Sequence, residues 1–288
     1  MGLKVELTDQ VALVTGAGAG IGRGIAVAMA ECGADIVVAE IDPDRGAEAA
    51  AAVERTGRRA VFVPTDVMDT DAVRAAVAHA EEAFGRLDIL VNNAGGVSGR
   101  RFLEQSERSW RRHIDINLVS ALAATSAAAP LMISGGRGGS IVNVATIEAS
   151  RAAPMYAVYA ACKAGLVSFT RTMAVELAEH GIRVNAISPD MTRTPGVSGL
   201  RQGPVPEELP PRDPEMEASI KSYIPLGREG VVAECGQVAA FLASPLAGYV
   251  TGANIPVDGG TWASSGWLRV PGDGWSLYGA SGSGEPLR

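Results

Sequence analysis

The stretch that decides the fold is Val11-Ala-Leu-Val-Thr15, which runs into Gly16-Ala-Gly-Ala-Gly20-Ile-Gly22. The apolar run predicts a buried strand, and the residues after the glycines predict a helix that continues through Cys32. Glycines between a strand and a helix let the backbone approach a pyrophosphate, which the free N–H groups of the helix N-terminus can bind. The spacing fits G-x-x-x-G-x-G and not G-x-G-x-x-G. A small glycine turn without a ligand is the alternative.

Apolar runs of strand length alternate with helical patterns along the rest of the chain. The further predicted strands are 36–39, 60–64, 88–91, 140–145, 182–187 and 254–257. This alternation implies an α/β fold with a parallel sheet and helices on both faces. Ligands bind at the carboxyl ends of the strands in such folds. Several residues with useful chemistry follow those ends: Gly16, Glu40, Asp66, Asn93, Thr146 and Pro189.

A predicted helix over 157–180 carries Tyr159 and, one turn later, Lys163. Residues four apart lie on the same face of a helix, so the two side chains meet. An ammonium beside a phenol favours the phenolate and lowers the pKa of the tyrosine. Such a tyrosine can act as a general acid or base on an alcohol oxygen. The alternative is an amphipathic tyrosine followed by a solvated lysine.

Glu40 closes the second predicted strand, about 20 residues beyond the first glycine. A carboxylate there accepts hydrogen bonds from the adenosine ribose hydroxyls and repels a 2′-phosphate. Neither Ala19 nor Ile41 supplies a positive charge for such a phosphate, and Arg45 is expected to face solvent. This pattern favours NAD over NADP. The alternative is that Glu40 only caps the helix after Pro43.

Two further polar positions have open interpretations. Asp66 competes with Asp69 and Thr70 to cap the helix that follows them. Asn117 falls in the middle of a long predicted helix over 107–133, where asparagine is locally unfavourable. Its side chain is therefore either exposed or engaged through its amide group.

Composition narrows the class of protein. The chain has 288 residues, 47% hydrophobic and 20% charged, with a formal net charge of −7, which argues against nucleic acid or an anionic membrane as a partner. No leader and no run of 18 apolar residues is evident, so we expect a cytoplasmic protein. The three cysteines lie far apart in the sequence, so we expect buried free thiols at Cys32, Cys162 and Cys235. The three histidines, His79, His113 and His180, lack partners at the spacing of metal ligands, so we expect no metal site.

With these residues in place, the chain resembles the short-chain dehydrogenase/reductase family over roughly residues 8 to 262. The matching motifs are Thr15-Gly-Ala-Gly-Ala-Gly-Ile-Gly22, Asn92-Asn-Ala-Gly95, Asn117, Tyr159-x-x-x-Lys163, Pro189-x-x-x-x-Thr194, Ile224-Pro-Leu-Gly-Arg228, Val250-Thr-Gly252 and Asp258-Gly-Gly260. The resemblance implies one Rossmann-type, doubly wound domain with a seven-stranded parallel sheet. It also implies hydride transfer between a nicotinamide ring and a secondary alcohol or ketone.

The resemblance also implies a role for each matching residue. Tyr159 is the acid/base, Lys163 lowers its pKa and holds the nicotinamide ribose, and Asn117 supports the proton relay. Thr194 and the backbone near Thr192 would hold the carboxamide. The implied contacts to NAD(H) are Gly16, Ala19, Gly20, Ile21, Glu40, Ile41, Asp66, Val67, Asn93, Ala94, Gly95, Tyr159, Lys163, Pro189, Thr192 and Thr194. Self-association as a homotetramer, through the helices 107–133 and 157–180, is implied as well.

Two positions depart from the family pattern. Thr146 stands where the family has a serine that hydrogen-bonds the substrate oxygen; it keeps the hydroxyl but adds a methyl group. Asp190 follows Pro189 where the family has glycine. The carboxylates of Asp190 and Glu148 could together favour a hydroxylated or cationic substrate. The alternative, which we expect, is that both side chains point to solvent. A catalytically weakened dinucleotide-binding or sensing protein is therefore the alternative function. Epimerisation or dehydration would need an extra substrate domain.

Substrate specificity is expected in the segment 195–222, which begins with six prolines over 195–214 and cannot start as a helix. In the family this segment is a lid over the substrate. The predicted substrate wall is Val97, Ile147, Glu148, Tyr156, Asp190 and Met191. Its apolar members suggest a medium-sized apolar or cyclic alcohol or ketone.

A tryptophan-rich extension, 263–288, follows the domain 1–262. Trp262, Trp267, Trp275 and Tyr278 lie at or within it. Aromatic side chains at this density favour contact with another surface. We expect the extension to pack on a neighbouring subunit, with a loose tail as the alternative for its last ten residues.

Overall fold

A seven-stranded parallel sheet forms the centre of the protein, as predicted. The computed structural model describes residues 4–200, 203–206, 208–270 and 274–277. The strand order is β3-β2-β1-β4-β5-β6-β9. These strands are β1 (Val11–Thr15), β2 (Asp35–Glu40), β3 (Ala60–Pro64), β4 (Ile89–Asn92), β5 (Gly139–Val144), β6 (Ile182–Pro189) and β9 (Asn254–Val257).

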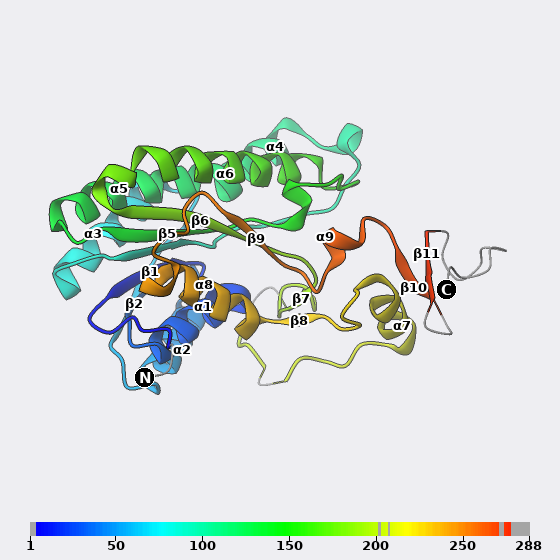
Figure 1. The fold of residues 1–288 in the computed structure, drawn as a ribbon, viewed down its shortest axis with the longest axis horizontal. Coiled ribbons are helices and arrows are strands. Elements are labelled where there is room, and N and C mark those ends of the chain that lie inside the picture. The colour runs from blue at the N-terminus through cyan, green and yellow to red at the C-terminus, as the bar shows by residue number, and fades with distance from the viewer. Residues whose placement is uncertain (1–3, 201–202, 207, 271–273, 278–288) are drawn as a thin grey trace.

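Helices cover both faces of the sheet (Figure 1). On one face lie α1 (Gly20–Glu31), α2 (Pro43–Glu54) and α8 (Val232–Ala243). On the other lie α3 (Thr70–Phe84), α4 (Glu107–Ile114), α5 (Ser120–Gly135) and α6 (Ala157–Glu176). Local sequence sets these ends: Asp42 accepts hydrogen bonds from two N–H groups at the start of α2, and Asp69 does the same for α3.

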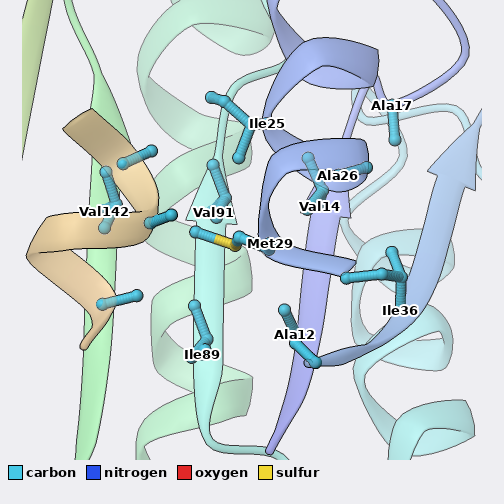
Figure 2. Packing of buried hydrophobic residues seen from close by; sticks show 14 of the residues in the cluster. Ala12, Val14, Ala17, Ile25, Ala26, Met29, Ile36, Ile89, Val91 and Val142 are labelled. Carbon is cyan, nitrogen blue, oxygen red and sulfur yellow. The ribbon is translucent and has the colours of Figure 1, made fainter. Parts of the chain in front are cut away.

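The hydrophobic core between the sheet and the helices α1 and α8 fixes the glycine turn (Figure 2). Val14 on β1 and Ile25 and Met29 on α1 are fully buried in it. Because β1 and α1 are both anchored in this core, the turn between them is held at a fixed place at the edge of the sheet.

The strand order reverses direction between β1 and β4, which run side by side. The strands after β1 extend to one side through β2 and β3, and those after β4 extend to the other. The chain therefore leaves the carboxyl ends of β1 and β4 toward opposite sides of the sheet, and this class of sheet binds ligands in the crevice at such a point.

The helical segment Glu107–Gly135 is continuous but not regular. A π-helical turn, Asp115–Val119, joins α4 to α5. Contrary to the expectation from apolar run length, the segment is long and apolar enough to match a membrane span, with a mean hydropathy of 1.7. Half of its most apolar window is buried inside the fold, and α5 packs on α3, which is the arrangement of a core helix.

The last described elements gather at one end of the molecule (Figure 1). They are β7 (Thr192–Arg193), α7 (Pro214–Tyr223), β8 (Gly230–Val231), α9 (Thr261–Ser264), β10 (Leu268–Val270) and β11 (Gly274–Ser276). Short 3-10 turns lie elsewhere in the sequence, at Phe102–Glu104, Ile147–Ala149, Ala178–His180 and Pro245–Ala247. The strands β10 and β11 form an antiparallel hairpin. Arg269 in this hairpin donates to Pro225 O (2.8 Å) and lies over the Trp275 ring, so the described extension contacts its own chain after α7. Tyr278 lies outside the described residues.

Candidate active site

The glycine turn is shaped so that side chains cannot fill it. Gly16 and Gly20 have φ of +63° and +56°, in the left-handed region that favours glycine. A Cβ atom at Gly22 would overlap the Gly16 carbonyl oxygen and the Asn93 amide nitrogen. A Cβ at Gly18 would lie 2.6 Å from Cγ of Glu40. This bare backbone, at the N-terminus of α1, fits a pyrophosphate group.

The crevice beside this turn is bridged by Asn93 and Thr15. The Asn93 side chain donates to Thr15 O (2.8 Å) and Gly16 O (3.1 Å). In return, Thr15 Oγ1 accepts from the backbone N–H groups of Asn93 and Ala94, both at 3.0 Å. The end of β4 is thereby tied to the glycine turn, which places Asn93, Ala94 and Gly95 along one wall of the crevice.

Glu40 points back to the glycine turn. Its carboxylate accepts from Gly18 N (2.9 Å), Ile41 N (2.9 Å) and Asp42 N (3.1 Å). The helix cap after Pro43 is instead Asp42, so the alternative role of Glu40 as that cap is wrong.

Arg45 does not face solvent, and the expectation that it does is wrong. The residue is 8% exposed, and its guanidinium donates to Gly203 O (2.7 Å) and Leu200 O (3.1 Å). Those carbonyls belong to the segment 195–213, which contains neither helix nor strand in its described residues. Arg45 therefore ties this segment to α2.

Tyr159 and Lys163 lie one turn apart on α6, with Lys163 Nζ 5.9 Å from the centroid of the Tyr159 ring. Lys163 is buried and donates to Val144 O (2.8 Å). Burial lowers the pKa of Lys163 to about 8. Burial, together with the charge of Glu148, raises the pKa of Tyr159 to about 12. The pKa of Tyr159 therefore lies above its ordinary value and not below it as predicted, because desolvation and the charge of Glu148 outweigh the hydrogen bond with Thr146.

Asn117 is engaged through its amide group, so the alternative interpretation, that its side chain is exposed, is wrong. The residue is 1% exposed and sits in the π-helical turn. Its amide donates to Gly96 O (2.8 Å) and His113 O (3.0 Å), and its oxygen accepts from Gly96 N (3.1 Å). A Cβ at Gly95 would lie 2.8 Å from Asn117 Oδ1 and 3.4 Å from Lys163 Nζ. Asn117 and Lys163 thus converge on Gly95.

Thr146 belongs to a chain of polar contacts that sequence alone did not reveal. Its hydroxyl donates to Glu148, with a longer contact to Pro189 O (3.3 Å). Glu148 in turn accepts from Arg151 (2.7 Å), and Arg151 lies 3.6 Å from Asp190 Oδ1.

The expectation that Glu148 and Asp190 point to solvent is therefore wrong. The side chain of Asp190 is 9% exposed, and its Oδ2 atom has no hydrogen-bond partner among the described residues. Burial raises the pKa of Asp190. The missed residue is Arg151, which pairs with Glu148 three positions earlier; this spacing was the available signal.

The other predicted cofactor residues are dispersed around the crevice. Asp66 accepts from Met68 N (2.9 Å) in a turn, while Asp69 caps α3. Val67 and Thr192 are buried. A Cβ at Gly20 would lie 3.4 Å from Thr194, so Thr194 lies against the glycine turn.

The predicted substrate wall is only partly accessible. Val97 and Tyr156 are exposed, but Ile147 is 1% exposed and presents no surface to a substrate, contrary to expectation. Val97 borders a cavity of about 410 Å³ that reaches His113 on α4. Met191 borders a separate cavity of about 530 Å³ beside α8 and β9. Neither cavity is lined by Tyr159 or Thr146, so these positions do not form one wall.

Metal ligands do not cluster in the residues that the structure describes: no three His, Cys, Asp or Glu side chains gather where they could hold an ion. Cys162 and Cys235 are buried free thiols, and Cys32 is partly buried.

Comparison with known proteins shows which family this chain belongs to. A family model described as enoyl-(acyl carrier protein) reductase matches residues 16–261. The chain belongs to the short-chain dehydrogenase/reductase family and is an oxidoreductase of that type. It is 40% identical to oxidoreductase UcpA of Salmonella typhimurium over 258 residues, which cover 89% of this chain and 95% of that one. It is 36% identical to trans-4-hydroxycyclohexanecarboxylate dehydrogenase of Sinomonas cyclohexanicum over 265 residues, 90% and 95% of the two chains.

Two solved structures are similar in fold and were determined with a nicotinamide cofactor. One is 7α-hydroxysteroid dehydrogenase complexed with NADH and 7-oxo glycochenodeoxycholic acid, with a TM-score of 0.82, 31% identity and coverage of 90% of this chain and 98% of that one. The other is carveol dehydrogenase from Mycobacterium avium with NAD, with a TM-score of 0.80, 34% identity and coverage of 90% and 99%.

Proposed function

We propose that the protein is an NAD(H)-dependent dehydrogenase or ketone reductase that acts on a secondary alcohol or ketone. The observation that carries this proposal is the convergence of Tyr159, Lys163, Asn117 and Thr146 beside the glycine turn. Among the groups that act on Tyr159, Thr146 is the one whose hydrogen bond lowers its pKa, and Lys163 and Asn117 meet at Gly95. A general acid needs such supporting groups within hydrogen-bond distance of the reacting oxygen.

The proposed division of labour follows from these contacts. The bound nicotinamide would supply or accept the hydride. Tyr159 would give a proton to the ketone oxygen or take it from the alcohol, and the Thr146 hydroxyl would orient that oxygen. The Lys163 ammonium would bind a ribose hydroxyl and stabilise a tyrosinate. Asn117 would hold the Gly95–Gly96 backbone in place through its contacts with Gly96.

A preference for NAD over NADP is proposed from Glu40 and Arg45. The Glu40 carboxylate lies against Gly18, where it would meet the adenosine ribose and repel a 2′-phosphate. Arg45, the nearby cation considered for such a phosphate, is engaged with the carbonyls of Leu200 and Gly203. Its charge is therefore not free to offset that repulsion.

The substrate is proposed to be a medium-sized apolar or cyclic alcohol or ketone, held under a lid formed by the segment 195–222. Two relatives carry names that place a hydroxyl on a ring, a cyclohexane and a steroid. The lid proposal is supported by the attachment of this segment to Arg45 and by its position after Thr194.

Assembly and location complete the proposal. We propose a cytoplasmic homotetramer formed through the helical segments 107–133 and 157–180, with the extension 263–288 against a neighbouring subunit. The domain 1–262 would carry all catalytic groups. Deletion of 263–288 is expected to change either the oligomer size or turnover. If neither changed, the proposed contact of the extension would be wrong.

A second candidate function is a dinucleotide-binding sensor with weak turnover. The specific observation in its favour is that Thr146, in the serine position, donates its hydrogen to Glu148. A hydroxyl with one hydrogen that is already donated cannot also donate to a ketone. Together with the raised pKa of Tyr159, this arrangement would slow the proton transfer.

The test is reduced-cofactor formation or loss with a panel of cyclic and acyclic secondary alcohols and ketones, with NAD and NADP in parallel. Turnover with NAD that Tyr159→Phe abolishes is expected. Tight NADH binding without turnover on any substrate would favour the sensor. Failure to bind either cofactor would refute both candidates.

A further inference from the structure

The ring of His113 has a polar partner at each of its two nitrogens. Nδ1 lies 2.8 Å from Ser109 O, one turn earlier on α4, and Nε2 accepts a hydrogen bond from Ser98 N (3.3 Å). A carbonyl oxygen can only accept and a backbone N–H can only donate. These partners therefore place the ring hydrogen on Nδ1 and leave the lone pair of Nε2 for Ser98. His113 is 7% exposed, which keeps water away from both contacts.

Asn117, one turn after His113, holds the same stretch of chain at a second point. Its amide group donates to Gly96 O (2.8 Å) and accepts from Gly96 N (3.1 Å). It also donates to His113 O (3.0 Å), so the two residues are joined across that turn. Together their side chains anchor Gly96 and Ser98, which are the two neighbours of Val97 in the chain.

The segment 95–99 runs beside the proposed catalytic groups. A Cβ atom at Gly95 would lie 3.4 Å from Lys163 Nζ, and one at Gly99 would lie 2.9 Å from the ring of Tyr156. Val97 stands between these two ends and is 39% exposed. Its backbone makes no hydrogen bond within the described part of the chain. The backbone of Val97 is therefore held only through its two neighbours.

We propose that His113 is a positioning residue for the substrate: by accepting from Ser98 N, it fixes Val97 as a wall of the substrate site. This inference rests on the proposed function, in which Val97 contacts the substrate. It assigns a role to a histidine that lies outside the matched motifs. A wall that is fixed in advance costs less to order when a ligand binds, so the contribution of His113 is to substrate affinity.

The variants His113→Gln and His113→Asn separate the two ring nitrogens. The glutamine amide oxygen can take the place of Nε2 and still accept from Ser98 N. The shorter asparagine amide takes the place of Nδ1, where it donates to Ser109 O and leaves Ser98 without an acceptor. We expect His113→Asn to raise KM about fivefold, as the loss of one neutral hydrogen bond does. His113→Gln should keep the wild-type KM.

The assay uses cyclohexanol with NAD, or the best alcohol of the panel if cyclohexanol is not turned over. Because His113→Asn leaves the contacts of Asn117 and Lys163 in place, kcat and the KM for NAD should stay unchanged. A general loss of structure would instead change all three constants. Arg111→Gln, at an exposed position of the same helix α4, is the matched control and should change none of them.

Amide hydrogen exchange read at single residues measures the contacts themselves and needs no turnover. In the wild type, Gly96 and Ser98 should exchange slowly because their N–H groups are bonded, and Val97 between them should exchange fast. In His113→Asn, Ser98 should exchange about fivefold faster while Gly96 stays slow. In His113→Gln, both should stay slow.

The wild-type exchange pattern decides the contact without any variant. If Ser98 exchanges as fast as Val97 there, the proposal is overturned. It is also overturned if His113→Asn leaves KM unchanged, or if both variants raise KM equally, since the ring would then act only by packing. Should circular dichroism show His113→Asn to be unfolded, His113→Leu, which fills the space without an acceptor, replaces it. If no protein turns over any alcohol, the proposed function fails, while the exchange rates still decide whether His113 holds Ser98.

Discussion

Gly22→Ala is the substitution that tests the glycine turn most directly. The added Cβ would overlap the Gly16 carbonyl oxygen and the Asn93 amide nitrogen, and would lie 2.9 Å from the Gly16 carbonyl carbon. Two of these atoms are backbone in a turn with φ of +63°, so they cannot simply rotate away. The third belongs to the side chain that ties β4 to the turn.

The expected cost combines these effects. Overpacking a tight site costs about 1–3 kcal/mol. The two hydrogen bonds of Asn93 contribute about 1 kcal/mol each. Because they are weakened rather than abolished, we expect Gly22→Ala to lower the free energy of unfolding by about 3 kcal/mol, or roughly 100-fold in the unfolding equilibrium. NAD affinity should also fall, because the displaced backbone is the proposed pyrophosphate site.

Urea unfolding at fixed protein concentration measures the first effect, and cofactor titration measures the second. Gly165→Ala is the matched control, because a Cβ there meets only Leu118, at 3.6 and 3.8 Å, within helix α6. Alanine should stabilise that helix by up to about 1 kcal/mol. If Gly22→Ala were as stable as Gly165→Ala and bound NAD equally well, the close approach of Gly16, Gly22 and Asn93 would contribute neither to stability nor to NAD binding, and the reasoning would be refuted.

Three further predictions concern charge. Glu40→Arg should exchange the cofactor preference, raising kcat/KM with NADP relative to NAD by at least about tenfold, since repulsion of the 2′-phosphate becomes attraction; an unchanged ratio would contradict the role of Glu40. Burial alone would raise the pKa of Asp35, but hydrogen bonds from Arg59 and the charge of Arg58 lower it. Its stabilisation is therefore complete above about pH 4 and lost as pH falls through the lower folded-state pKa. Asp35→Asn should lower the free energy of unfolding by about 1–2 kcal/mol at pH 7, as measured by chemical unfolding, and should reduce the loss of stability at acid pH. An unaltered loss of stability at acid pH would contradict this role of Asp35. Arg45→Met should speed proteolytic cleavage within 195–213, while the free energy of overall unfolding changes little. Equal cleavage rates in the variant and the wild type would show that the two carbonyl contacts do not hold that segment.

The elements were predictable because their signals are local. Strand β3 was predicted with the bounds that the structure shows, and β2 within one residue at either end. Both lie in apolar runs that end at turn residues, and such runs have few alternatives in an α/β chain. Asn117 was also informative from sequence, because a buried amide in mid-helix must find partners, and it finds them through a π-helical turn.

The errors share a different cause, which is contact between residues distant in the chain or paired across a turn. Arg45 reaches carbonyls more than 150 positions away, and no local pattern encodes that contact. Glu148 and Asp190 looked solvated because acidic residues usually are. Arg151 reverses that expectation, since a guanidinium between two carboxylates allows all three side chains to be partly buried.

The two departures from the family pattern, Thr146 and Asp190, are ends of one network and not independent losses. Thr146 donates to Glu148, Glu148 pairs with Arg151, and Arg151 lies against Asp190. With two carboxylates and one guanidinium, the network carries excess negative charge beside the proposed acid/base, opposite in sign to Lys163. A dehydrogenase and a weakened sensor therefore differ here in one physical quantity, the direction in which the Thr146 hydroxyl points its single hydrogen. A bound substrate that offers its own hydroxyl to Thr146 suits the observed direction, and a ketone suits the reverse.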